Sequence, residues 1–552
     1  MRMIRYTYIV LFLLLVSQAM AQETDTAPTG AIEDAQIIIE KDKPLTLPRA
    51  SRVYKPSAIQ PVVTDTVNLS FYLSQPQATF DPYAFSPEVK SLSKTEALEA
   101  NTNYLKVGFG NYLSPEIRGF AGVADGNRRV GLFVDHESFA RGPVRKDESA
   151  YSNTQVILQG SLSNTGLVVS PFVNYELERY YFYGYEDEPA EQGITDRIAT
   201  NYFRLGSDFS GSNGAFSYTA TPFLAFTTMG ASGQEAFNRE SNLGLNGSGT
   251  YKQNESLEFR LGTDYSYSGY QSGVIQKRHV FHLIPEVRYH NDRLLLAGGA
   301  ALGVSSDSVG ASTALGVFPR FKGSFAINEQ FAIMANATGG FAANDLNTLR
   351  KRNRYLEDTL TLLNQREHVN MEIALEYKMR HDMSLEPFIS YSNTANYAFF
   401  VPSGLDSARY TLRYDTGGLG RSAFGVRYRL INNRSQLSAE MAMVSYQTDT
   451  LAEAWYLPGT TLKLNYSQLI GEQWRVHGEM YVWDGLKGPV GGTSEAYVLP
   501  TIVDLSVGGS YQIDDRFSAY VDIENLLGIR YERYLNYPVR GITAKIGFIY
   551  RF

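Results

Sequence analysis

Long segments of this chain alternate between apolar and polar residues, and this period of two constrains the fold more than any other feature. From Val369 to Lys378 (VNMEIALEYK), every second residue is apolar and the residues between are mostly polar or charged. Successive side chains of a β-strand point to opposite faces, so this segment has one apolar and one polar face. The pattern recurs at 257–267, 424–430 and 462–467. It predicts many amphipathic strands.

The length of these segments favours a membrane barrel over a soluble sandwich. They extend over about 10 to 15 residues, whereas strands of soluble proteins have about 5 to 6. Aromatic residues gather near the predicted strand ends, as at Trp455, Trp474 and Trp483, which is typical of interfacial girdles. After the N-terminus, the longest apolar run is near 294–304, too short for a spanning helix of roughly 20 residues.

The first residues predict export. Arg2 and Arg5 precede an apolar core at 8–16 (YIVLFLLLV), and the small-residue pattern of a cleavage site follows at 19–21. Residues 1–21 are therefore interpreted as a signal peptide. The alternative, an uncleaved anchor, is disfavoured because the apolar run is short. The chain has no cysteine, which excludes disulfides and thiolate metal sites.

Short turns and longer connections alternate along the rest of the chain. The turns are predicted near 163–166, 211–214, 290–292, 327–329, 380–382, 431–433, 471–472 and 514–515, and the longer segments near 140–150, 182–197, 228–237, 343–365, 400–416, 447–457, 485–499 and 526–540. Outer-membrane barrels have short periplasmic turns and long extracellular loops. Residues 99–552 are thus predicted to form an all-β, antiparallel, multi-pass barrel of about 22 strands in the outer membrane, beginning near Asn101.

Residues 22–98 have a different character. Ile37, Ile38 and Ile39 are strand-like, and prolines spaced among basic residues such as Arg49 and Arg52 follow them. Such a sequence cannot build a sheet interior, so we expect an extended periplasmic or lumenal segment. These five residues are candidates for docking a partner by β-strand addition. A periplasmic tail with no partner is the alternative.

Both ends of the predicted barrel resemble a known family. Asn103 to Leu113 (NYLKVGFGNYL) resembles the opening strand, and Phe517 to Gly528 (FSAYVDIENLLG) with Gly541 to Phe552 resembles the closing strands, of TonB-dependent-receptor-like barrels of Bacteroidota. The resemblance covers most of residues 100–552. Such receptors carry a plug domain and a short box that engages TonB, but residues 22–98 lack the plug's glycine-rich texture. The resemblance therefore implies a receptor-like barrel without the usual plug, and TonB engagement is not carried over.

The size of the barrel raises the question of what fills its lumen. Barrels of about 22 strands are wider than porins and are plugged, so loops, the N-terminal segment or a partner must occupy the interior. The chain is expected to belong to an outer-membrane transport or multi-protein complex. The alternative is a non-transporting scaffold subunit of assembly or secretion machinery. Expected partners are outer-membrane lipid, lipopolysaccharide and other outer-membrane or periplasmic proteins. The net charge of −7 without a basic stripe excludes nucleic acid.

Two segments near predicted outer loops are candidate contact sites. Tyr180, Tyr181, Tyr183 and Tyr185 either contact an extracellular ligand or protein, or belong to the girdle and the packing of their own loop. The basic segment 349–356 (LRKRNRYL) either meets lipid phosphates or is a solvated loop.

Catalysis is not expected. The seven histidines are scattered without H-E-x-x-H spacing, and His279 and His282 would point to opposite faces of a strand. No G-x-S-x-G segment marks a nucleophile near His477. We therefore expect no enzyme activity, no cofactor and no metal site.

The closing strand makes the most specific structural prediction. Its lipid-facing residues are predicted to be Ile542, Ala544, Ile546, Phe548, Tyr550 and Phe552, and its lumen-facing residues Thr543, Lys545, Gly547 and Arg551.

Overall fold

The computed structural model describes residues 103–185, 197–232, 235–309, 312–490 and 495–552. The predicted signal peptide and the segment 22–98 lie outside these residues. The barrel strands are β1 (Tyr104–Gly110), β2 (Ser114–Asp125), β3 (Arg128–Phe139), β4 (Tyr151–Asn164), β5 (Leu167–Tyr181), β6 (Arg197–Asn213), β7 (Phe216–Ala231), β8 (Asn238–Lys252), β9 (Leu257–Ser272), β10 (Val274–His290), β11 (Leu294–Asp307), β12 (Ser312–Ala326), β13 (Phe331–Ala343), β14 (Asn364–Arg380), β15 (Met383–Ala395), β18 (Leu419–Ile431), β19 (Ser435–Gln447), β20 (Thr460–Ile470), β21 (Trp474–Asp484), β24 (Ile502–Gln512), β25 (Phe517–Glu524) and β26 (Thr543–Arg551).

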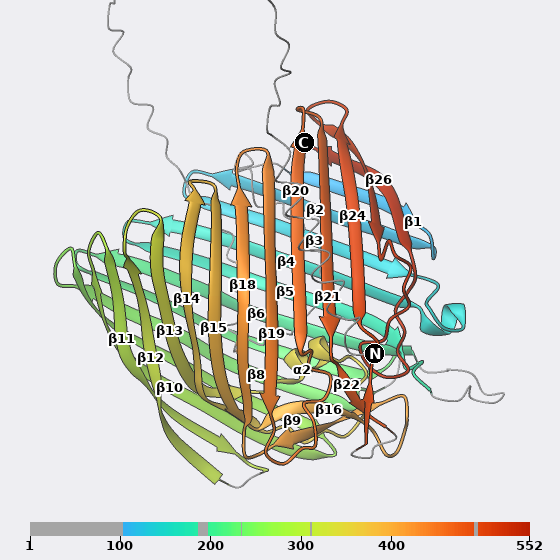
Figure 1. Ribbon diagram of the computed structural model, residues 1–552, viewed down its shortest axis with the longest axis horizontal. Coiled ribbons are helices and arrows are strands. Elements are labelled where there is room, and N and C mark those ends of the chain that lie inside the picture. Colours follow the sequence, from blue (N-terminus) through green and yellow to red (C-terminus); the bar gives the residue numbers. More distant parts are fainter. Residues whose placement is uncertain (1–102, 186–196, 233–234, 310–311, 491–494) are drawn as a thin grey trace, which may run out of the picture. The chain divides into compact units, whose positions relative to one another are not determined.

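These strands form one closed antiparallel barrel of 22 strands (Figure 1). Each strand pairs with the next along the chain, and β1 closes the ring by pairing with β26 in the register Val107↔Phe548. Closure removes the free edges that an open sheet of long strands would expose. The predicted fold class is therefore confirmed, and the first strand begins at Tyr104, close to the expected position near Asn101.

The two faces of the wall follow the predicted alternation. On β26, Ile546 and Phe548 are 67% and 60% exposed on the outer face, as a surface against hydrocarbon requires. Lys545, which directly precedes Ile546, is buried on the lumenal face, where it forms ion pairs with Glu137 and Glu524. A charged residue is thus buried because it faces the lumen and finds carboxylates there.

The two ends of the barrel differ in the length of their connections. At the short-turn end, ten connections have two to four residues, and glycines with positive φ such as Gly166 and Gly214 occupy several of them because left-handed backbone suits glycine. All eight predicted turns are confirmed, and two more occur at 126–127 and 253–256. The other connections share the opposite end, which we call the long-loop end.

The long-loop end carries additional secondary structure within its connections. These elements are the 3₁₀ turn η1 (Lys146–Ser149), the helix α2 (Leu346–Arg352), the hairpin strands β16 (Tyr397–Pro402) and β17 (Tyr410–Asp415), and the hairpin strands β22 (Lys487–Pro489) and β23 (Ala496–Val498). Figure 1 shows α2, β16 and β22 gathered at this end of the barrel. No helix in the described ranges is long and apolar enough to cross a membrane.

Candidate functional site: the loop cap

The connections at the long-loop end share one apolar core. Four of them, 344–363, 396–418, 448–459 and 525–542, together with the hairpin β22–β23, form what we call the loop cap. Its buried side chains include Leu346, Leu349, Leu356, Leu360, Leu362, Phe399, Phe400, Tyr410, Trp455, Tyr456, Leu486, Leu499, Tyr534 and Tyr537. Burying each large apolar side chain stabilises the cap by about 1.5–3 kcal/mol. Loops that share a core in this way form a packed structure of their own.

Helix α2 is the centre of the cap. Asp345 caps its N-terminus by accepting hydrogen bonds from the backbone N–H and the hydroxyl of Thr348, at 2.8 and 2.7 Å. Leu346 and Leu349 are fully buried on one side of the helix. Basic residues fill its last turn, where the negative end of the helix dipole favours them. A seven-residue helix is marginal alone, so its contacts must hold it.

Ion pairs join α2 to the opposite wall of the barrel. The Arg350 guanidinium lies 2.9 Å from a Glu178 carboxylate oxygen and 3.2 Å from one of Glu176. Arg354 contacts Glu178 at 3.0 Å, and Lys351 contacts Glu176 at 3.3 Å. Both glutamates lie on β5, and seven strands of wall, β6 to β12, separate β5 from the β13 end of this loop. We call this cluster the latch, because it bridges the lumen.

The latch keeps its charges. Burial disfavours the charged form of Arg350, but the carboxylates of Glu176 and Glu178 outweigh this effect and raise the pKa of the guanidinium. The pKa of Arg354 is likewise raised, chiefly because Glu178 overcomes the cost of burial. Removing one partner of such a pair leaves a buried charge uncompensated, which is costly. The latch therefore holds firmly only when all its members are present.

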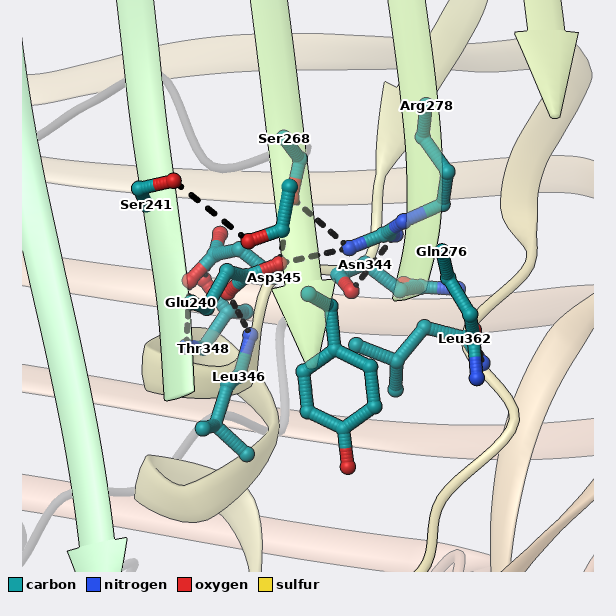
Figure 2. Close-up of polar contacts among 12 residues, drawn as sticks. Glu240, Ser241, Ser268, Gln276, Arg278, Asn344, Asp345, Leu346, Thr348 and Leu362 are labelled. Carbon is teal, nitrogen blue, oxygen red and sulfur yellow. Dashed lines mark hydrogen bonds and ion pairs between the residues drawn. The ribbon is translucent and has the colours of Figure 1, made fainter. Parts of the chain in front are cut away.

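A second anchor holds the start of the same loop (Figure 2). Arg278 on β10 and Glu240 on β8 form a fully buried ion pair at 2.6 Å, and the hydroxyl of Ser268 donates to the same carboxylate. The other Glu240 oxygen accepts from the backbone N–H of Leu346 at 2.5 Å, and Arg278 donates to the carbonyl of Asn344 at 2.9 Å. The wall thus binds the backbone on both sides of the helix start.

Gln276 fastens the far end of the loop. Its side-chain amide donates to the carbonyl of Leu360 at 2.8 Å and accepts from the backbone N–H of Leu362 at 2.9 Å. Because an unpaired buried backbone group costs about 1–3 kcal/mol, these bonds explain how an irregular segment stays buried.

Stacked tyrosines join the separate loops of the cap. The rings of Tyr355 and Tyr537 stack with centroids 3.5 Å apart, and Tyr183 packs on Tyr537 at 4.8 Å. The hydroxyl of Tyr537 donates to the carbonyl of Ala408, and that of Tyr410 donates to the carbonyl of Leu535 at 3.1 Å. Burial is the main reason why the pKa values of Tyr355, Tyr410 and Tyr537 all lie well above the usual value for a phenol.

The predicted aromatic contact residues lie at the edge of this cap. Tyr180 is buried, and its hydroxyl donates to the carbonyl of Arg354 at 2.6 Å. The hydroxyl of Tyr183 accepts from that of Tyr355 at 3.2 Å and donates to the carbonyl of Pro538 at 3.3 Å, while Tyr181 and Tyr185 are partly buried. The docking candidates Ile37, Ile38, Ile39, Arg49 and Arg52 lie outside the described residues.

The predicted roles of the basic segment 349–356 were both wrong. Arg350 is 2% exposed and Leu349 and Leu356 are fully buried, so the segment is neither a solvated loop nor a lipid contact. It lies inside the cap because Glu176 and Glu178 receive its charges. The sequence held a usable signal: two glutamates spaced two apart share one face of β5 with Tyr180.

The described residues contain no group of three or more histidine, aspartate or glutamate side chains arranged to hold a metal ion. The packed cap is anchored to β5, β8, β9 and β10 by buried charges and hydrogen bonds, and it connects opposite sides of the barrel.

No protein-family model matches the sequence, and no curated protein sequence matches it. Solved structures do resemble the fold. The FrpB iron transporter of Neisseria meningitidis has a TM-score of 0.65 at 11% identity, over 82% of each chain. The ferric-catecholate import receptor Fiu of E. coli K12 has a TM-score of 0.61 at 11% identity, over 82% of each chain. FpvA of P. aeruginosa, solved with bound pyoverdine, has a TM-score of 0.61 at 12% identity, over 82% of this chain and 71% of that chain. At these identities the likeness establishes that the chain shares the 22-stranded barrel fold of such receptors.

Proposed function

We propose that this chain is an outer-membrane transport barrel of the TonB-dependent-receptor-like kind, and that its own loop cap closes the outer mouth. Two observations support an outer-membrane location: the closed wall of 22 strands and its apolar outer face. The structures that it resembles include an iron transporter and a ferric-catecholate import receptor, so uptake of a small solute is the function that we assign.

The latch carries this proposal. A wall that only supported partner proteins would have no need of buried ion pairs across its lumen, because such pairs gain little stability over apolar packing. Charged contacts can, however, be exchanged for contacts with a ligand or with water. The Arg350 cluster therefore suits a cap that closes the lumen and can be released.

The proposed arrangement differs from that of a receptor with a complete plug. Residues 22–98 have no plug-like texture, so in this proposal the loops take over closure at the outer end. The N-terminal segment or a periplasmic partner then occupies the rest of the lumen, and the barrel works as one component of a larger complex.

Thiol labelling tests the closure directly, because the chain has no native cysteine. Leu349→Cys places a thiol in the core of the cap, where the side chain is fully buried. Leu405→Cys is the matched control, since Leu405 is 96% exposed in the same cap. We expect a membrane-impermeant maleimide to label the control rapidly and Leu349→Cys slowly, and to label both rapidly in a Glu176→Gln/Glu178→Gln background.

Conductance of the same proteins in planar bilayers tests whether the cap blocks passage through the lumen. We expect no steady current from the wild type and a steady channel from the latch variant. A large steady current from the wild type would show that the cap does not close the lumen. A silent latch variant whose Leu349→Cys is nevertheless labelled would show that the cap is not the only closure, as when the N-terminal segment fills the rest of the lumen.

A further inference from the structure

Arg204 stands apart from the other deeply buried arginines of the lumen. It lies on β6, on the same face as Tyr202, while its neighbour Leu205 is exposed on the outer face. The guanidinium lies between two aromatic rings, 4.1 Å from the centroid of Phe223 and 5.4 Å from that of Phe172. Only 5% of the residue is exposed.

Glycines on the neighbouring positions make room for these rings. A Cβ at Gly206 would lie 2.7 Å from the ring of Phe172, and one at Gly244 would collide with the ring of Phe223. Each ring therefore covers a position where a Cβ would force it to move. The two rings and two glycines restrict the space around the Arg204 guanidinium.

Other lumenal arginines show what a compensated charge looks like. Arg278 pairs with Glu240, and Arg350 with Glu176 and Glu178. Arg427 on β18 contacts three carboxylates, those of Glu372, Glu386 and Glu440, at 2.7, 2.6 and 3.0 Å. In each case a carboxylate offsets the cost of removing the guanidinium from water.

Arg204 has no such carboxylate among the described residues. Its cross-strand neighbours are Asn174 and Ala225, and the closest lumen-facing glutamate along β5, Glu176, already serves Arg350 and Lys351. The Nε and Nη2 atoms are buried without a hydrogen-bond partner in the described part of the chain. Arginine cannot lose its proton at physiological pH, so the charge persists.

A guanidinium fork held in this way is complementary to a group with two negatively charged oxygens. Because the rings already orient the fork, little rotamer entropy is lost when such a group binds.

We propose that Arg204, oriented by Phe172 and Phe223, binds the carboxylate or phosphate group of an anionic solute inside the barrel. The site lies on the wall next to Tyr202, whose cross-strand partner Glu176 pairs with Arg350 of the latch. An anion at this point is therefore placed beside the cap. Binding does not depend on transport and is measurable on the closed barrel.

Inorganic phosphate and citrate are the probes, each compared with chloride at equal ionic strength. The readouts are calorimetric titration of the purified barrel and the unfolding temperature from its heat-modifiable mobility. A ligand that binds only the folded state raises that temperature. We expect at least one of the two anions to bind and to stabilise the wild type. Comparing the two shows whether the site prefers phosphate or carboxylate.

The variants separate a binding role from a structural one. Arg204→Gln should weaken anion binding at least tenfold and remove the thermal response, and Arg204→Lys should retain part of both because it keeps the charge but not the fork. Arg427→Gln is the matched control. It should lower the unfolding temperature in every buffer, because it removes the ion pairs of Glu372 and Glu440 and one of the two of Glu386, and should keep the full anion response. Absence of any phosphate or citrate effect on the wild type, or an unchanged effect in Arg204→Gln, would overturn the proposal.

Discussion

The barrel wall and the loop cap bury their side chains by different rules. In the wall, the odd or even position of a residue along its strand decides which face its side chain is on. Ile546 and Phe548 face outward and Lys545 faces inward because side chains alternate along a strand. In the cap, contacts between distant segments decide. Tyr180 bonds to a carbonyl 174 residues away, and Tyr534 to one 182 residues away. A local rule thus builds the barrel wall, whereas the cap depends on long-range packing.

This difference implies that mutations can disrupt the packing of the cap without unfolding the wall. The wall has a continuous hydrogen-bonded ladder from β1 to β26. The cap depends on a few buried leucines, a latch and stacked tyrosines. Changes in the cap should therefore open the mouth and leave the barrel folded.

The largest effect is expected from a charge in the core of the cap. Leu349→Asp would bury an unpaired carboxylate and should destabilise the closed cap by about 3–5 kcal/mol. We expect a steady conductance with unchanged heat-modifiable mobility of the barrel. Leu405→Asp, at an exposed position of the same cap, should leave both unchanged. Loss of the folded barrel in Leu349→Asp would contradict the separation of wall and cap.

A smaller effect is expected from the latch. Glu178 accepts from Arg350, Arg354 and the hydroxyl of Tyr151. Glu178→Gln keeps the shape but removes the charge, and should weaken closure by about 1–3 kcal/mol. The measurement is the labelling rate of Leu349→Cys. Glu376→Gln, which breaks a pair with the half-exposed Lys378 on the wall, should leave that rate unchanged.

The smallest loss of closure per residue is expected when the buried tyrosines of the cap ionise at alkaline pH. Burial raises the pKa of Tyr414 to about 12 and those of Tyr355, Tyr410 and Tyr537 well above the usual value. A phenol whose folded pKa is raised stabilises the cap fully below its unfolded pKa of about 10, and this stability falls as pH rises toward the folded value. Conductance should therefore appear between about pH 10 and 12.

Tyr414→Phe checks the assignment. This variant cannot ionise at position 414, so the loss of closure should shift to higher pH, and the absorbance titration of phenolate should lose its corresponding late step. A wild-type barrel that unfolds as a whole before any current appears would show that the cap is as resistant to alkali as the wall.

Much of the wall was predictable because its determinants are local. Alternation within 369–378 and in the closing strand identified the faces, and turn residues near 163–166 and 211–214 identified the ends. The 22 strands followed from counting back from the last one. The role of segment 349–356 was not predictable in the same way, because Arg350 is buried only where β5 supplies Glu176 and Glu178 from across the lumen.

By itself, then, the sequence determined a closed antiparallel barrel with an apolar outer face, since period-two patterning acts over a few neighbouring residues. Only the tertiary structure decided that the long connections pack into one cap, that Arg350 finds its carboxylates, and that Arg204 finds none among the described residues. The reason is that burial and charge compensation depend on which segments meet in space. Which segments come into contact depends on the closure of all 22 strands into a ring, and not on the sequence of any one strand.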